Sequence, residues 1–145
     1  MSKVNYLDPT RESFDAFKKL PRNTPINMLN LIKLRVSAEY SQDSNNANKG
    51  WSGERAYQEY GKSSGVIFKR VGGSIIWRGK MESMLIGPQE VEWDIAFIAR
   101  YPNSGAFLEM VTDPGYQLAV VNRQAAVLTS RLVRFGELEG SDLFA

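Results

Sequence analysis

Six side chains of this 145-residue sequence have chemical types suited to holding a small molecule. They are an amide, two phenols, an indole, a carboxylate and a guanidinium: Asn30, Tyr60, Tyr116, Trp77, Asp94 and Arg123. Phenols and amides donate and accept hydrogen bonds, while a guanidinium binds carboxylate or phosphate through two parallel bonds. Gathered in one cleft with apolar walls, this set predicts a site for a small, partly apolar or anionic molecule. The sequence identifies no catalytic residue.

The chain contains neither histidine nor cysteine, which restricts its chemistry. It cannot form a Ser-His-Asp triad, a Cys-His pair, a zinc-finger site or a His-ligated haem site. Proton transfer near neutral pH would need a carboxyl group or a lysine with a shifted pKa, or a tyrosine. We expect no metal ion and no cofactor.

Three of the candidate residues each allow two interpretations. Arg123 shares a helical stripe with Tyr116, so it either bonds an internal acceptor such as Asn30, a backbone carbonyl or a carboxylate, or binds an anionic ligand. Asn30 is either tied to neighbouring backbone or directed into a pocket. Asp94 either forms a salt bridge across a dimer interface or accepts a proton. For the salt bridge, the partners considered are Arg78, Arg100 and Arg131.

Trp77 also has two interpretations, because aromatic side chains fill the core of most small domains. Its place on a strand that borders the predicted cleft makes it a candidate apolar wall of the site instead.

Four strands should position these residues. Residues 91–101 alternate apolar and polar side chains, which predicts a strand with one buried face. Residues 26–35 are nearly continuously apolar and predict a central strand. Residues 74–86 predict a third strand with a bulge at Gly79 and a hairpin turn at Gly87-Pro88, and residues 128–135 a fourth.

Helices are marked by their capping residues. Asp8 and Pro9 predict the start of a helix over about 9 to 20, and Ser52 caps a second that ends at Gly72-Gly73. A third helix, capped by Asn103 or Ser104, is broken at Asp113-Pro114. The Ser- and Asn-rich residues 37–50 form either a lid or a disordered connection.

The order of elements predicts an α+β fold of the ferredoxin-like βαββαβ type, with a four-stranded antiparallel sheet and an extra N-terminal helix. We expect residues 1–22 to form an N-terminal helical arm and residues 23–145 a single domain. The second sheet face carries apolar residues that need cover, so a homodimer is expected. These residues are Ile76, Met84, Ala96 and Ile98.

Other classes of function are excluded by composition. The net charge of +2 is too small to indicate nucleic-acid binding, and residues 92–97 do not match an RNA-binding strand. No apolar run reaches the roughly 20 residues that a membrane helix needs, and residues 1–6 lack a signal-peptide core. A cytoplasmic protein is expected.

Several short motifs, taken in order and spacing, resemble the DUF1330 family of the dimeric α/β-barrel superfamily. They are Met28 to Arg35, Tyr57 to Tyr60, Gly72-Gly73, Trp93-Asp94, Tyr101-Pro102, and Met110 through Asp113-Pro114-Gly115-Tyr116 to Arg123. The resemblance implies the fold and the dimer. It supplies no catalytic residues, because the family has no established activity.

The wider superfamily includes cofactor-free monooxygenases, small isomerases, haem-dependent enzymes and stress-responsive barrels, which bind ligands in the cleft between sheet and helices. Two functions therefore stay open, an enzyme without a metal and a binding or structural dimer without turnover. A solvent-connected cavity lined by the candidate residues favours the enzyme, and filled packing favours the dimer.

Overall fold

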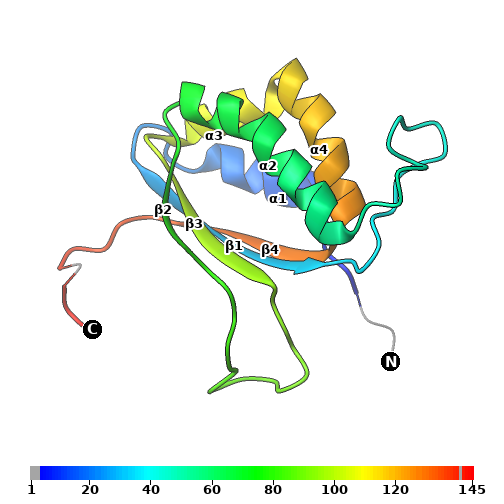
Figure 1. Cartoon of the computed structure of the whole chain (residues 1–145). Helices are drawn as coiled ribbons and strands as arrows, with labels where there is room; N and C mark the ends of the chain where they lie inside the picture. Colours follow the sequence, from blue (N-terminus) through cyan, green and yellow to red (C-terminus); the bar gives the residue numbers. More distant parts are fainter. Residues whose placement is uncertain (1–3, 141) are drawn as a thin grey trace.

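The computed structural model describes residues 4–140 and 142–145. Its helices lie on one side of a four-stranded sheet (Figure 1). Across the sheet the strands run β2 (Ser74–Gly79), β3 (Ile95–Tyr101), β1 (Ile26–Leu34) and β4 (Val127–Phe135), and each neighbouring pair is antiparallel. The predicted ferredoxin-like βαββαβ fold is confirmed, with β1 in a central position.

Strands β2 and β3 are shorter than predicted. Strand β2 ends at Gly79 and β3 begins only at Ile95, so residues 80–94 form a long loop instead of a hairpin turn at Gly87-Pro88. The Asp94 carboxylate accepts a hydrogen bond from Leu34 N at 2.7 Å, and Asp94 N donates to Ile32 O at 2.8 Å. Asp94 thereby anchors the chain to β1 at the start of β3. Met84 consequently belongs to this loop and not to the sheet face.

The bulge lies between Ile75 and Trp77, not at Gly79. Ile75 is opposite the buried Ala99, whereas Trp77 is opposite Ile98, and residues opposite each other share a sheet face. The extra residue moves Trp77 to the face away from the helices. Arg78 is paired with Phe97 on the helix side.

The helices are α1 (Arg11–Lys19), α2 (Gly53–Arg70), α3 (Ser104–Thr112) and α4 (Pro114–Ala126). Ser52 caps α2 as predicted, and of the two candidates for α3 it is Asn103 that caps the helix. The break predicted at Asp113-Pro114 is present, with Asp113 as the cap of α4. The prediction for α1 was wrong, because Thr10 and not Asp8 is its cap. Thr10 forms a capping box with Ser13, so Pro9 lies outside the helix.

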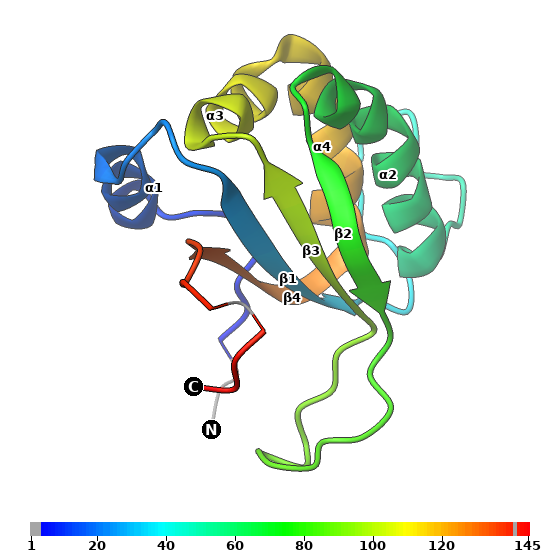
Figure 2. The same cartoon turned by 90° about the vertical axis from the view of Figure 1, so that its left-hand side faces the viewer.

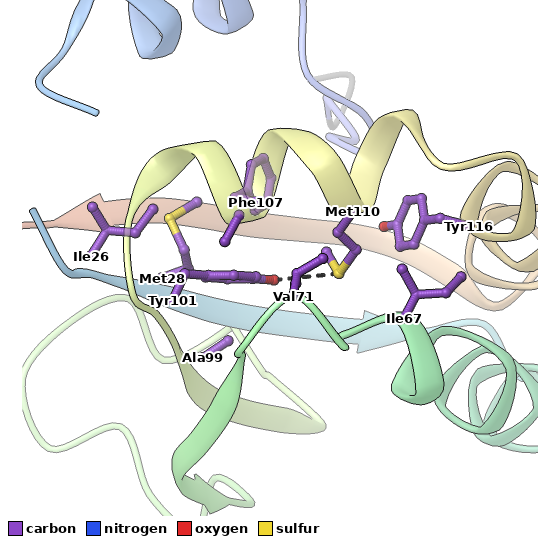
Figure 3. Close-up of a cluster of buried hydrophobic side chains, with 10 residues drawn as sticks. Ile26, Met28, Ile67, Val71, Ala99, Tyr101, Phe107, Met110 and Tyr116 are labelled. Atoms are coloured by element: carbon purple, nitrogen blue, oxygen red, sulfur yellow. Dashed lines mark hydrogen bonds between the residues drawn. The ribbon is translucent and has the colours of Figure 1, made fainter. Parts of the chain in front are cut away.

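Two groups of buried side chains occupy part of the space between sheet and helices. The larger one surrounds Tyr101, whose hydroxyl lies 3.8 Å from the Met110 sulfur (Figure 3). The smaller one contains Ile32 and Val127. On β1, Asn30 separates the residues of the two groups, so a polar side chain interrupts the apolar row at mid-strand.

The N-terminal segment is bonded along β4 and the adjacent helices. Ser130 N donates to Tyr6 O at 2.8 Å, and Tyr6 N donates to Thr129 Oγ1 at 3.0 Å. Helix α1 then packs through Phe17, whose ring centroid lies 5.1 Å from that of Phe107. Helix α1 therefore lies on the same side of the sheet as the other helices (Figures 1 and 2).

Candidate functional site

A cleft of about 1800 Å³ lies between the sheet and the helix layer. Its walls come from the N-terminal segment, all four helices and every strand of the sheet. Most sites for small molecules measure about 300 to 1,000 Å³, so one such molecule would occupy only part of this space. Five of the six predicted site residues line the cleft: Asn30, Tyr60, Asp94, Tyr116 and Arg123.

Two of these residues meet across the helix layer. The hydroxyl groups of Tyr60 on α2 and Tyr116 on α4 lie 2.9 Å apart, and the rings meet edge to face. Burial raises the pKa of Tyr116, the neighbouring Tyr60 raises it further, and the charge of Arg123 opposes the shift. The Tyr116 phenol therefore stays protonated at neutral pH and can act as a hydrogen-bond donor but not as a base.

Arg123 bonds the N-terminal segment. Its guanidinium donates to Leu7 O at 2.5 Å and to Ser130 Oγ at 3.1 Å, and Ser130 Oγ in turn donates to Tyr6 O at 2.9 Å. Of the two interpretations, the structure shows an internal acceptor, a backbone carbonyl distant in sequence. A guanidinium has five N–H groups, so this half-buried side chain keeps donors beyond these two bonds.

Asn30 is tied to backbone, since its Nδ2 donates to Met28 O at 3.1 Å. Within the described part of the chain, its side-chain oxygen accepts no hydrogen bond, which leaves an acceptor on the cleft wall.

Asp94 lines the cleft together with Lys33. Besides its bond to Leu34 N, its carboxylate lies 3.8 Å from Lys33 Nζ, and its side chain is 41% exposed. Within one protomer, the described residues Arg78, Arg100 and Arg131 form no ion pair with Asp94, and the salt bridge expected across a dimer interface stays a prediction. An exposed pair of this kind contributes little to stability.

Trp77 does not join the other candidates. Because of the bulge at Ile76, its indole lies on the opposite sheet face beside Ile98, where it is 52% exposed. Arg78, the next residue, lines the cleft instead. An extra residue in a strand moves every later side chain to the opposite face of the sheet. The prediction lacked this bulge, so it placed Trp77 in the cleft.

Two cleft residues were missed by the sequence reasoning. The Arg78 guanidinium makes no hydrogen bond or ion pair with any described residue, although Arg78 lines the cleft. Tyr57, one helical turn before Tyr60, is the other. Burial raises the pKa of Tyr57, Tyr60 adds to this shift, and the charges of Arg123 and Arg78 lower it. Both guanidiniums therefore act on the same part of the cleft.

The loop of residues 37–50 does not line the cleft. Tyr40 donates to Asn122 Oδ1 at 2.6 Å and Asn46 donates to the same oxygen at 3.3 Å, so this loop is bonded to α4. The structure thus gives no support for a lid formed by these residues.

In residues 4–140 and 142–145, no group of three or more carboxylate side chains is placed to hold a metal ion. None of the helices in the same part of the chain has the length and apolarity to cross a bilayer.

The sheet topology and the helices on one side define a small α+β protein with a ferredoxin-like fold. A DABB-family protein of that fold from Mesorhizobium loti superposes with a TM-score of 0.52, covering 79% of this chain and 97% of its own. The two sequences are 14% identical, so the comparison shows the fold alone.

Residues 37–134 match DUF1330, a domain of unknown function, and the chain belongs to this family. RPA0582, a protein of unknown function from Rhodopseudomonas palustris, is 46% identical, with a TM-score of 0.86 over 94% of this chain and 99% of its own. Its methylated form is 45% identical, with a TM-score of 0.88 over 96% and 99%. No curated protein matches the sequence. The family resemblance is confirmed, and no specific function is established by these comparisons.

Proposed function

We propose that the protein binds a small, partly apolar anion in the cleft between sheet and helices. The observation that carries this proposal is Arg78, a guanidinium on the cleft wall without a protein partner among the described residues. Guanidinium groups bind carboxylates and phosphates through paired hydrogen bonds. An anionic group of the ligand would pair with the Arg78 guanidinium.

The remainder of the cleft suits a ligand with an apolar body. Met28, Phe97 and Ala99 line its sheet side, and the paired phenols of Tyr60 and Tyr116 line its helix side. A ligand oxygen that accepts a hydrogen bond from Tyr60 would replace part of the tyrosine pair. Apolar walls with a few convergent donors are the usual composition of a small-molecule site.

The test compares ligands of matched size and different charge. Native mass spectrometry of the purified protein would first identify co-purifying molecules, and calorimetry would then compare octanoate and benzoate with their neutral amides. We expect the carboxylates to bind at least about fivefold more tightly than the amides, since charged hydrogen bonds exceed neutral ones by about 1 kcal/mol or more.

Arg78→Met should abolish this preference without changing the fold, because Arg78 is exposed. The matched control is Arg22→Met, since Arg22 is also exposed but lies outside the cleft. Equal affinities for acid and amide in the unaltered protein, or an unchanged preference in Arg78→Met, would refute the proposal.

A second candidate function is favoured by the tyrosine pair. In the bond between the two phenols, 2.9 Å long, one hydroxyl accepts, and that hydroxyl can donate its own proton to a carbonyl oxygen that becomes negatively charged during a reaction. This arrangement supports an enzyme that uses side chains alone on a substrate of the same class. Product formation from the bound molecules, lost in Tyr60→Phe while their binding persists, is the result expected for catalysis.

We also propose that the protein is a homodimer built through the sheet face opposite the helices, which we call the open face. Ile76, Trp77 and Phe135 are 53%, 52% and 50% exposed there. A shallow groove of about 350 Å³ lies on the open face, lined by Asn27, Leu29, Ile76, Ile98 and Phe135. Exposed apolar surface of this kind is rare on monomers, and a second sheet would cover it.

A further inference from the structure

The 80–94 loop is firmly attached at its base. Lys33 Nζ lies 3.7 Å from Glu92 Oε2 and 3.8 Å from Asp94 Oδ1. The Arg131 guanidinium lies 5.3 Å from the centre of the Trp93 ring. Together with the two bonds of Asp94 to β1, these contacts fix the direction in which the loop leaves the sheet.

The tip of the loop is folded as well. The side chain of Gln89 donates to Met84 O at 2.9 Å, and Val91 N donates to Pro88 O at 3.3 Å. This turn leaves Leu85 and Ile86 89% and 91% exposed. Connections between paired strands usually need only about 2 to 5 residues. A longer loop that ends in two adjacent exposed aliphatic side chains indicates a contact with another surface.

The direction of the loop favours a second copy of the chain as that surface. Both views show the loop extending away from the helices, past the open face (Figures 1 and 2). Two packed sheets lie about 10 Å apart. A protomer stacked on the open face would therefore lie beside this loop.

Charge agrees with this arrangement. The charged residues that the four described strands place on the open face are all basic: Lys33, Arg100 and Arg131. The 80–94 loop has one basic residue, Lys80, and four acidic ones, Glu82, Glu90, Glu92 and Asp94. Glu82 and Glu90 form no ion pair within the described residues. Within one protomer, Lys33 is paired with Glu92 and Asp94, and Arg100 with Glu137. The charges left for another copy are those of Glu82 and Glu90 on the loop and of Arg131 on the open face, which are complementary.

We propose that the 80–94 loop of each protomer packs its Leu85-Ile86 tip against the other protomer, so that two reciprocal loops hold the dimer together with the open face. This inference rests on the homodimer proposed above. It adds a contact surface outside the sheet.

The test is the double variant Leu85→Asp, Ile86→Asp, studied by sedimentation over a range of protein concentrations. Both side chains are exposed in the protomer, so the variant should fold normally. We expect the dimer to dissociate at least about 100-fold more readily, because four apolar side chains lose their contacts in each dimer. Leu118→Asp is the control, since Leu118 is 78% exposed on α4, away from the open face.

A second measurement uses the absence of native cysteine. A single thiol introduced by Leu85→Cys should be protected from a maleimide at concentrations where the dimer forms and should react on dilution. Leu118→Cys should react equally at both concentrations.

The possible failures are distinguishable. A chain that stays monomeric at every concentration would overturn both the homodimer and the loop contact. A dimer that persists with unchanged affinity in the double variant, with a reactive thiol at position 85, would overturn the loop contact alone.

Discussion

Replacing Arg123 by methionine tests whether this guanidinium holds the N-terminal segment to the domain. The substitution keeps an apolar stem of similar length and removes the bonds to Leu7 O and Ser130 Oγ. A hydrogen bond to a charged group contributes about 1.5 to 3 kcal/mol, and Ser130 retains its bond to Tyr6 O. We expect the free energy of unfolding to fall by about 2 to 4 kcal/mol.

For a chain of this length, about 3 °C of melting temperature corresponds to 1 kcal/mol, so the midpoint should fall by about 6 to 12 °C. Urea denaturation gives the free energy of unfolding directly. All variants are compared at one protein concentration, because the apparent stability of a dimer depends on that concentration. Arg22→Met, at an exposed site, should change stability by less than about 0.5 kcal/mol.

A double-mutant cycle identifies the partner. In a chain that lacks residues 1–9, the Leu7 carbonyl is gone, so Arg123→Met should cost about 1.5 to 3 kcal/mol less than it does in the full chain. An equal cost in both chains would show that Arg123 acts elsewhere. A loss below about 0.5 kcal/mol in the full chain would refute the role of a structural link and favour its role as a ligand anchor.

Three further outcomes are expected. Ile98→Glu should make the protein monomeric in sedimentation experiments, because the dimer would bury two carboxylates on the open face, and a persistent dimer would contradict that interface. Deleting residues 1–22 should lower the melting temperature but preserve a single cooperative transition, whereas an unfolded product would make this arm part of the core. Burial raises the pKa of Tyr57, Tyr101 and Tyr116, so the unfolded chain loses these protons first and stability should fall as pH rises above about 10. Phenolate absorbance should show these three of the six tyrosines ionising only on unfolding; ionisation of all six in the folded protein would contradict this.

Local signals in the sequence were sufficient for much of the fold. Ser52, Asn103 and Asp113 cap their helices because each binds a backbone N–H two or three residues further on, a contact that depends on neighbours in sequence. The continuous apolar character of β1 likewise predicted its central place.

The errors arose where distant residues decide the structure. The alternation in residues 81–86 is that of a strand, yet the pairing of β2 with β3 ends at Gly79 and Ala96. The bulge at Ile76 has no local marker, so the sequence placed Trp77 in the cleft and missed Arg78. Tyr60 and Tyr116 were predicted together because their helical stripes face the same sheet. The acceptor of Arg123 lies 116 residues away, and no local pattern predicts it.

The bond between Leu7 and Arg123 also has a consequence for the order of folding. Strand β1 pairs only with β3 and β4, so its hydrogen bonds form late during synthesis from the N-terminus. The N-terminal segment bonds residues of β4, which is made after the other three described strands. Contacts between residues so far apart in the sequence form slowly. The cleft is therefore completed only after the first and last described elements meet, and a nascent chain that lacks β4 has helices but no finished binding site.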